Sequence, residues 1–291
     1  MNIIEIYKTF PSQEDCIKYL EKVKWNNEPR CPYCNSTKHS KTKYDNRYFC
    51  SNCRTSYSAT VGTIFHDSKI PLQKWFLAIC LVLNAKKGIS SRQLARDIEV
   101  NKNTAWRMQM QIRKAMNETP SLLSGIVEMD ETYIGGKPRK SNNKDDDNNI
   151  TPLKRGRGTK KTAVVGMVQR HGKVIAKKQS KLSFMDLKRT AKESIDFNNS
   201  ILMTDDYRGY IPFKNFINHQ TVNHSNKQYV DGFKHTNTIE GFWGLLKRGI
   251  TGQYHWLSDK YLNRYINEFC FKYNNRQNKN IFELLLINAV R

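Results

Sequence analysis

The sequence predicts an α/β protein in which a small zinc-binding segment and a helical region precede a larger domain that contains strands. Two Cys-x2-Cys pairs lie near the N-terminus, apolar residues with helical spacing follow them, and strand-like segments occur mainly after Pro120. We therefore expect three parts. Residues 1–68 would hold an N-terminal helix and a four-cysteine zinc ribbon, residues 69–120 a helix-turn-helix region, and residues 121–291 the strand-containing domain with a helical C-terminus.

The charge of the chain points to a polyanionic partner. Its 291 residues include 49 Lys and Arg against 26 Asp and Glu, which gives a formal net charge of +23. An excess this one-sided favours nucleic acid, and solubilising surface charge is the weaker alternative.

Membrane insertion and secretion are not expected from the sequence. The chain has no run of 18 apolar residues, and its longest apolar stretch, residues 75–83, is typical of a buried helix. The N-terminus contains acids and lacks an apolar segment followed by small residues, so we predict no secretory signal and a cytoplasmic, nucleoid-associated protein. Seven cysteines in such a chain favour reduced thiols and metal binding over disulfides.

Four of these cysteines have the spacing of a structural zinc site. They form a C-x2-C-x15-C-x2-C pattern, made of Cys31, Cys34, Cys50 and Cys53. Each pair can place two thiolates on one side of a tetrahedral ion, and the β-prone segment between the pairs can bring them together. Four thiolates leave no open coordination position, so we predict a structural Zn²⁺ ion; four incidental cysteines are the alternative.

The segment after Gly88 has the pattern of a helix-turn-helix. Ser90 or Ser91 can cap a first helix through Ile98, a turn follows at residues 99–101, and a second helix runs from about residue 102 to residue 116. The small core between the helices is expected from Leu94, Ile98, Val100 and Trp106.

The second of these helices is the predicted DNA-reading element. It carries basic residues and no acid, which suits a helix that enters the major groove. Near its start, Asn103, Thr104 and Arg107 are predicted to read bases. The other basic residues predicted to contact phosphates are Lys102, Arg113 and Lys114. The alternative is an ordinary helical hairpin with a basic outer face.

After Pro120 the pattern alternates between strands and helices. Strands are predicted at residues 125–136 and 201–206, and a hairpin at residues 162–179 turns at His171-Gly172. The predicted helices are residues 183–195, with Ser183 as N-cap, and residues 236–249, 258–273 and 280–290.

Three acids in this region are the predicted catalytic residues. Asp130 lies in a predicted strand, Asp205 closes a short apolar strand, and Glu240 follows 35 residues later, with Lys247 seven residues beyond it. Such a triad can hold two divalent cations that activate the attacking and leaving oxygens of a phosphodiester.

Each acid also has an interpretation without catalysis. Asp130 can be a solvated acid on an edge strand, and Asp205 an ordinary turn residue. Glu240 can complete a capping box with Asn237, and Lys247 can be a solvated lysine of a basic helix. The sequence leaves the roles of His224 and His235 open.

Several motifs in order resemble one known family. MDETYIGG, TDDYRGY, HTNTIEGFWGLLKRGITGQYH and RYINEFCFKYNNR, together with CPYCNS and the segment that begins CSNCRTSYS, resemble the bacterial insertion-sequence transposases that carry a zinc ribbon before a DDE domain, the ISXO2-like group related to Merlin elements. The resemblance covers roughly residues 15–290. It implies an RNase H-like catalytic domain in which Asp130, Asp205 and Glu240 are the catalytic acids and Lys247 is the lysine seven residues on.

The predicted function is that of a DNA transposase. The resemblance implies an enzyme that uses Mg²⁺ or Mn²⁺, binds the terminal inverted repeats, cleaves the strand at the transposon end and joins it to target DNA. Pairing two ends implies at least a homodimer in the working complex. Two alternatives remain: a zinc-ribbon and helix-turn-helix regulator derived from an inactive transposase, and an RNase H-like nuclease without strand transfer.

Overall fold

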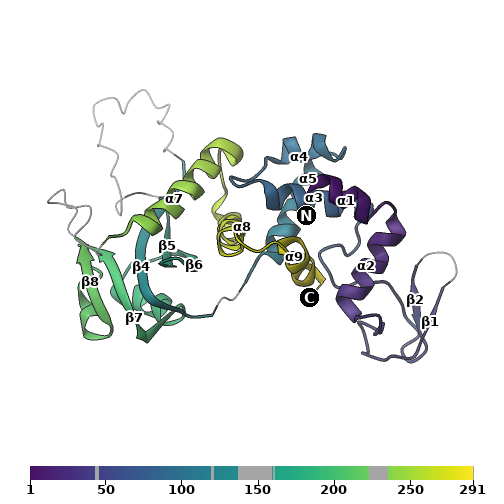
Figure 1. Cartoon of the computed structure of the whole chain (residues 1–291), viewed down its shortest axis with the longest axis horizontal. Coiled ribbons are helices and arrows are strands. Elements are labelled where there is room, and N and C mark those ends of the chain that lie inside the picture. The colour runs from purple at the N-terminus through teal and green to yellow at the C-terminus, as the bar shows by residue number, and fades with distance from the viewer. Residues whose placement is uncertain (43–45, 119–120, 137–158, 160, 223–234, 291) are drawn as a thin grey trace, which may run out of the picture. The chain divides into compact units, whose positions relative to one another are not determined.

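A computed structural model describes residues 1–42, 46–118, 121–136, 159, 161–222 and 235–290 (Figure 1). The chain divides into two compact units. Unit 1 comprises Met1–Glu118 and Asn275–Arg291, and unit 2 comprises Thr119–Asn274. Within the described ranges, no helix is long and apolar enough to cross a membrane.

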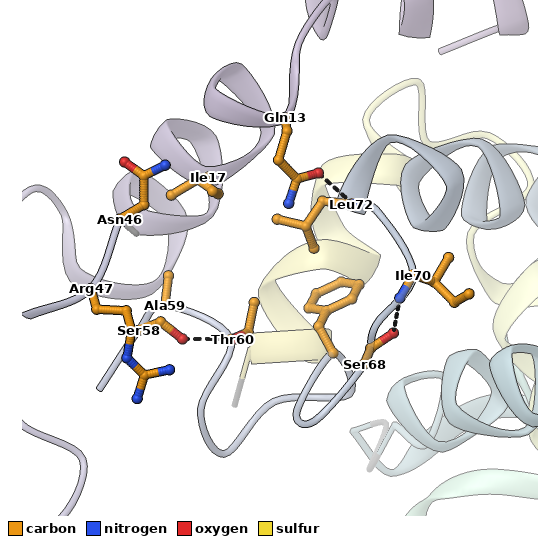
Figure 2. Close-up of a pocket in the computed structure, with 11 residues that line it drawn as sticks. Gln13, Ile17, Asn46, Arg47, Ser58, Ala59, Thr60, Ser68, Ile70 and Leu72 are labelled. Atoms are coloured by element: carbon orange, nitrogen blue, oxygen red, sulfur yellow. Dashed lines mark hydrogen bonds between the residues drawn. The ribbon is translucent and has the colours of Figure 1, made fainter. Parts of the chain in front are cut away.

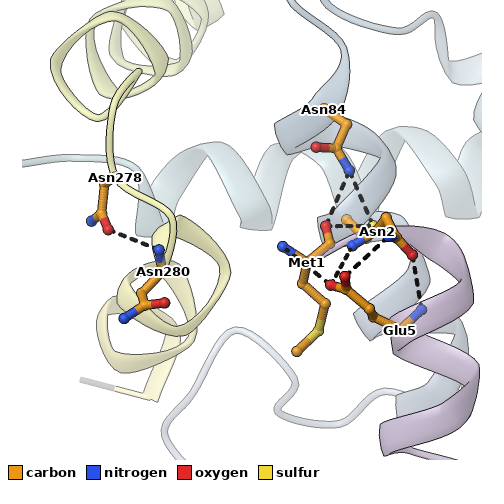
Figure 3. Close-up of polar contacts among 7 residues, drawn as sticks. Met1, Asn2, Glu5, Asn84, Asn278 and Asn280 are labelled. Carbon is orange, nitrogen blue, oxygen red and sulfur yellow. Dashed lines mark hydrogen bonds and ion pairs between the residues drawn. The ribbon is translucent and has the colours of Figure 1, made fainter.

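Unit 1 begins with two capped helices, α1 (Ile3–Thr9) and α2 (Gln13–Trp25). Both have a capping box: Asn2 exchanges hydrogen bonds with Glu5, and Ser12 with Asp15. The Asn84 side chain also donates to the Met1 carbonyl oxygen (Figure 3), at a distance of 3.3 Å, which ties the start of α1 to the end of α3 (Leu72–Asn84).

The cysteine region folds as a small antiparallel sheet. Its strands are β1 (His39–Lys41), β2 (Tyr48–Cys50) and β3 (Ser56–Tyr57), in the order β1-β2-β3. Its core is small and consists of Tyr48, Tyr57 and buried cysteines, with Trp25 of α2 packed against them. So little apolar burial suits a segment that gains its stability from a bound metal.

The remaining helices of unit 1 come from both ends of the chain. They are α3 (Leu72–Asn84), α4 (Ser91–Asp97), α5 (Lys102–Ala115) and α9 (Ile281–Val290). The ring centroids of Phe76 in α3 and Phe282 in α9 lie 5.9 Å apart, and α9 also contacts α2 and α5. Just before α9 begins, Asn280 N donates a hydrogen bond to Asn278 Oδ1 at 2.8 Å (Figure 3). The last helix of the chain therefore belongs to the N-terminal core, although it follows the transposase-like motifs in sequence.

The two helices of the predicted helix-turn-helix begin where the sequence places them. Ser90 caps α4 and Asn101 caps α5, each by accepting a backbone N–H. In the turn between them Glu99 takes a left-handed conformation with φ 51°. Leu94 and Ile98 are buried as predicted, but the expectation for Trp106 is wrong, because 38% of its surface is exposed.

Unit 2 is built on a five-stranded mixed sheet. Its strands are β4 (Leu123–Ile134), β5 (Thr162–Gln169), β6 (Val174–Gln179), β7 (Ile195–Asp205) and β8 (Asn218–Val222). They lie in the order β6-β5-β4-β7-β8, where β4, β5 and β6 pair antiparallel while β4, β7 and β8 pair parallel. In order of appearance this is a 3-2-1-4-5 sheet, the RNase H-like arrangement.

The side chains of β4 point alternately to the two faces of the sheet, and they contact a different helix on each face. Val127 and Met129 lie in an apolar cluster with Leu187 of α6 (Phe184–Lys192). The intervening Glu128 bonds to the first turn of α7 (Asn237–Gly249). Because successive strand residues point to opposite faces, α6 and α7 lie on opposite sides of the sheet. Helix α8 (Leu262–Asn274) contacts β6.

Two details of unit 2 differ from the sequence-based expectation. Strand β7 begins at Ile195, where a helix was predicted to end, and the predicted strand at residues 201–206 covers only its second half. Its first half is polar but pairs with β4, with Ile195 opposite Leu123. Strand β8 has a polar sequence at the sheet edge and was not predicted. Pairing with a neighbouring strand, which is a tertiary effect, decides both cases.

Close contact between α7 and the sheet depends on Gly166 of β5. A Cβ atom at this position would lie 2.5 Å from the indole ring of Trp243 in α7, which is shorter than any real contact. We therefore expect Gly166→Ala to displace α7 and to lower the free energy of unfolding by about 1–3 kcal/mol, measured by urea denaturation.

Gly241 supplies the matched control, because it lies in α7 and a Cβ atom added there would have no neighbour within 4 Å. Gly241→Ala should stabilise the protein by up to about 1 kcal/mol through helix propensity. Equal effects of the two substitutions would contradict the tight packing at Gly166.

Candidate functional site

The first two predicted acids lie on adjacent parallel strands. Glu128 of β4 pairs with Met203 of β7, and extending this register by two residues places Asp130 beside Asp205. Asp205 is the last residue of β7, and it accepts a hydrogen bond from the Tyr207 backbone N–H at 3.2 Å. The structure therefore brings these two carboxylates together at one end of the sheet.

The surroundings of Asp130 disfavour its ionised form. Burial, followed by the negative charges of Glu131 and Asp205, raises the pKa of Asp130 to about 7. Two hydrogen bonds oppose this shift: one comes from the backbone of Glu131, and in the other Trp243 Nε1 of α7 donates to Asp130 Oδ2 at 3.0 Å. A half-buried carboxylate pair of this kind is stabilised by a cation, which matches the donor preference of Mg²⁺ or Mn²⁺.

Glu131 follows Asp130 in sequence but points to the other face of the sheet. Its Oε2 accepts a hydrogen bond of 2.6 Å from the hydroxyl of Tyr210, which is fully buried in the apolar cluster on the α6 side. Its separation from the α7 face agrees with the side-chain alternation expected for a strand.

The third acid lies in the first turn of α7. Glu240 is exposed, and its Oε1 accepts a hydrogen bond from Thr236 Oγ1 at 3.0 Å. The N-cap is Thr236, so the alternative capping box between Asn237 and Glu240 is not formed. Lys247 is exposed in the last turn of α7, two turns beyond Glu240 on the same face.

The three acids are not gathered around one point in this structure. Among the described residues, the four cysteines are the only set of three or more His, Cys, Asp or Glu arranged to hold a metal ion. Asp130 and Asp205 are neighbours, whereas Glu240 remains on the exposed side of α7 with Thr236 as its partner. His224 lies outside the described residues, and His235 lies 3.2 Å from a different carboxylate, that of Glu128.

Glu128 was not among the functional residues predicted from the sequence. Glu128 is completely buried, and it accepts hydrogen bonds from the backbone N–H groups of Thr238 and Ile239 in α7. Arg170 Nε donates to it at 2.7 Å. The available signal was an acid two residues before Asp130, on the same strand face and within an apolar stretch.

The four cysteines lie close together as their spacing predicts. Their Sγ atoms all lie within 4.8 Å of one another, with 3.6 Å between Cys31 and Cys53 and 3.5 Å between Cys34 and Cys50. Zinc–sulfur bonds of about 2.3 Å in a tetrahedron require sulfur separations of about 3.8 Å, so the four thiolates fit a zinc ion.

Two similar turns present these cysteines. The N–H of Cys31 donates to Ser36 O and that of Cys50 to Thr55 O, both at 3.0 Å. Hydrogen bonds from the Ser36 backbone and the Asn52 side chain lower the pKa of Cys34 to about 6, whereas burial raises that of Cys31 to about 11. These hydrogen bonds favour the thiolate form of Cys34, whereas Cys31 would lose its proton when a metal ion binds.

Five of the six residues predicted to contact DNA have exposed or partly exposed side chains on α5. Lys102, Asn103, Arg107 and Lys114 are exposed, and Thr104 is half-buried. Arg113 requires a correction: none of its surface is exposed, because it lies on the inner face of α5 within unit 1. Helical periodicity places it with Gln109 and Ile112 rather than with Lys114.

A separate cavity of about 440 Å³ lies in unit 1 (Figure 2). Figure 2 shows that several of its polar groups bond to each other: Gln13 accepts from the Leu72 N–H, Ser58 bonds to Thr60, and Ser68 accepts from the Ile70 N–H. None of the predicted catalytic, zinc-binding or DNA-binding residues lines it, and we assign it no function.

Comparisons with known proteins agree on one family. The family model for the ISXO2-like transposase domain matches residues 122–274, which is more than half of the chain, and the model for the transposase zinc-ribbon domain matches residues 11–56. An uncharacterized protein in transposable element ISH50 of Halobacterium salinarum is 29% identical over 259 residues, which cover 84% of this chain and 85% of the relative.

Solved structures give only weak similarity. The Mos1 strand transfer complex aligns with a TM-score of 0.32 and 12% identity, and covers 74% of this chain and 78% of the Mos1 chain. A pre-cleavage Mos1 transpososome gives a TM-score of 0.28 and 14% identity, with 72% and 76% of the chains covered. The fold of unit 2 is therefore described by its own strand order.

Trp25 should report the metal state of the four cysteines. Its ring lies 5.7 Å from that of Tyr48 and 5.8 Å from that of Tyr57, in the same small core as the cysteines. If a zinc ion bound by these cysteines holds this core together, a strong zinc chelator should expose Trp25 and shift its fluorescence emission to longer wavelength. In Trp25→Phe the chelator should leave the emission of the other tryptophans nearly unchanged. An unaltered wild-type spectrum after zinc removal would contradict the structural role of the ion.

The raised pKa of Asp130 predicts a pH-dependent stability. Without added divalent cations the folded state keeps the Asp130 proton up to about pH 7, whereas the unfolded chain loses it near pH 3.8. The free energy of unfolding of the wild type, relative to Asp130→Asn, should therefore fall as pH rises from about 4 to about 7 and level off above it. Urea titrations at several pH values measure this difference. A difference that stays constant over this range would show that Asp130 is not held in its protonated form.

Proposed function

The chain belongs to the ISXO2-like transposase family, and on that premise we propose that unit 2 cuts and joins DNA with Asp130, Asp205 and Glu240 as its catalytic acids. The main support is the half-buried pair of Asp130 and Asp205 on neighbouring parallel strands. Mutual repulsion and burial make this pair costly unless a cation neutralises it.

The oxygen donors of this pair fit Mg²⁺ or Mn²⁺. When bound, such cations supply the Lewis acidity that activates the attacking oxygen and stabilises the charge on the phosphodiester. Asp130 and Asp205 would hold the cations, and Glu240 would complete the second position after a change in its side chain or in α7. Since Glu240 accepts a hydrogen bond from Thr236, this change would include breaking that partly buried bond.

Residues around the acids have positioning roles in this proposal. Trp243 would orient the Asp130 carboxylate through its indole N–H, which donates to Oδ2. Lys247 is exposed on the Glu240 face of α7, where its ammonium group can bind a DNA phosphate and guide the strand towards the acids.

Unit 1 is proposed to bind the terminal inverted repeats. Helix α5 begins after a short turn and exposes Lys102, Asn103 and Arg107 at its start, which suits a helix that reads the major groove. The net charge of the whole chain, +23, favours attraction to phosphates. We further propose that two copies of the chain act together, because transposition pairs two ends.

An end-cleavage and joining assay tests the catalytic proposal. Purified protein is incubated with labelled DNA that spans the genomic flanks of its own gene, with Mg²⁺ or Mn²⁺. We expect cuts at the repeat boundary and joined products, and a loss of at least about 100-fold in both for Glu240→Gln, because removal of a transition-state electrostatic group has effects of this size.

Glu193→Gln is the control, since the Glu193 carboxylate forms an exposed ion pair with Lys177 in unit 2 and has no part in the proposed site. Binding without cleavage, equal in the wild type and in Glu240→Gln, would contradict the proposal and support a regulatory protein instead. Cleavage without joined products would indicate a nuclease.

A further inference from the structure

We propose that Glu128 is a positioning residue: from strand β4 it caps helix α7 and thereby sets the place of Glu240 relative to Asp130. The inference rests on the proposed catalytic roles of Asp130 and Glu240. In this proposal Glu128 contacts neither DNA nor a cation. It fixes the separation between Asp130 and Glu240, which would make such contacts.

Glu128 supplies the capping hydrogen bonds that the N-cap side chain of α7 does not make. The first backbone N–H groups of a helix have no partner within the helix, and the N-cap residue usually supplies an oxygen for them. In α7 the N-cap Thr236 makes no such bond. Glu128 Oε2 instead accepts from Thr238 N at 2.8 Å and from Ile239 N at 3.0 Å.

The second carboxylate oxygen extends the same attachment. Glu128 Oε1 accepts from the Thr238 hydroxyl at 2.9 Å and from Arg170 Nε at 2.7 Å. Arg170 Nη2 also donates to the carbonyl oxygen of His235 at 2.8 Å, just before the helix begins. The buried negative charge is therefore compensated by the Arg170 guanidinium and by the positive end of the helix dipole. Glu128 holds the chain after the N-cap, and Arg170 holds the chain before it.

The position of these contacts links them to the acids. Glu128 and Asp130 lie on the same face of β4, two residues and about 7 Å apart. Ile239, whose N–H Glu128 accepts, directly precedes Glu240 in sequence. One turn further along α7, Trp243 bonds to Asp130. Two attachments of α7 to β4, one turn apart, fix the position and the direction of the helix more firmly than the Trp243 contact alone would.

The chemistry of Glu128 explains why a carboxylate is needed. Both of its oxygens accept, and the groups that bond to them all donate. A glutamine would keep one acceptor but would place its own NH2 group against these donors. We therefore expect Glu128→Gln to weaken the attachment of α7 without changing the size of the side chain.

A double-mutant cycle on the full-length protein tests the inference. We measure Mn²⁺ affinity by calorimetry for the wild type, Glu128→Gln, Glu240→Gln and the double variant, and kcat and KM for end cleavage. Glu128→Gln should weaken Mn²⁺ binding and lower kcat by about 10-fold, the usual effect of a residue that orients ligands, with KM for DNA unchanged. In the Glu240→Gln background it should cause no further loss of Mn²⁺ affinity, because Glu128 acts through Glu240.

A purely structural role predicts a different pattern. It would lower the melting temperature and weaken Mn²⁺ binding equally in both backgrounds, and that result would overturn the inference. If Glu128→Gln fails to fold, Thr238→Val removes one donor to Glu128 at constant size and should show the same background dependence with a smaller loss of about 3-fold. Unchanged Mn²⁺ affinity and kcat in a folded Thr238→Val protein would also overturn it.

The cycle separates this inference from the proposed function. If Glu240→Gln binds Mn²⁺ and cleaves DNA like the wild type, the catalytic assignment of Glu240 is wrong whatever Glu128 does. If Glu240→Gln is impaired while Glu128→Gln matches the Glu193→Gln control, only the positioning role of Glu128 is wrong.

Discussion

Strand β4 imposes the constraint on which unit 2 depends, because its successive side chains must serve two opposite faces. Val127 and Met129 enter the apolar cluster under α6, while Glu128 and Asp130 face α7. One strand thus anchors the core and carries the acids. A shift of its register by one residue would bury the acids in the apolar cluster and expose the core residues, so the stability of the sheet and the placement of the site cannot vary independently.

Helix α7 illustrates how buried polar groups can be tolerated in this arrangement. Glu128 is fully buried, but it has donors for both oxygens and a guanidinium beside it. Gly166 removes the side chain that would keep the Trp243 ring away from the sheet. Together these features hold a helix with an exposed acid, Glu240, against a strand with a half-buried one, Asp130. Burial, together with the charges of Glu131 and Asp205, raises the pKa of Asp130 in this position.

Unit 1 uses a different source of stability in each of its parts. The cysteine region has a core of only a few aromatic residues and thiols, and its four sulfur atoms are arranged for a metal ion. The helical part buries a larger set of aromatic residues, and it recruits α9 from the far end of the chain, where Phe282 packs on Phe76. Because the last helix packs within unit 1, the ends of the sequence are joined in one core, and the strand-containing unit is inserted between them.

The sequence by itself determined the local features of this protein. Short-range rules located the zinc-type cysteine spacing, the caps at Ser90 and Ser183, the hairpin around His171-Gly172 and the starts of α5 and α7, since each depends on neighbouring residues. Only the tertiary structure decided that Arg113 is buried, that Trp106 is exposed, that the polar start of β7 is a strand, and that the cap of α7 comes from Glu128 rather than from Asn237. The physical reason is that these outcomes depend on partners far away in the sequence or on which helix face meets the core, and periodicity along the chain contains no information about the distant partner.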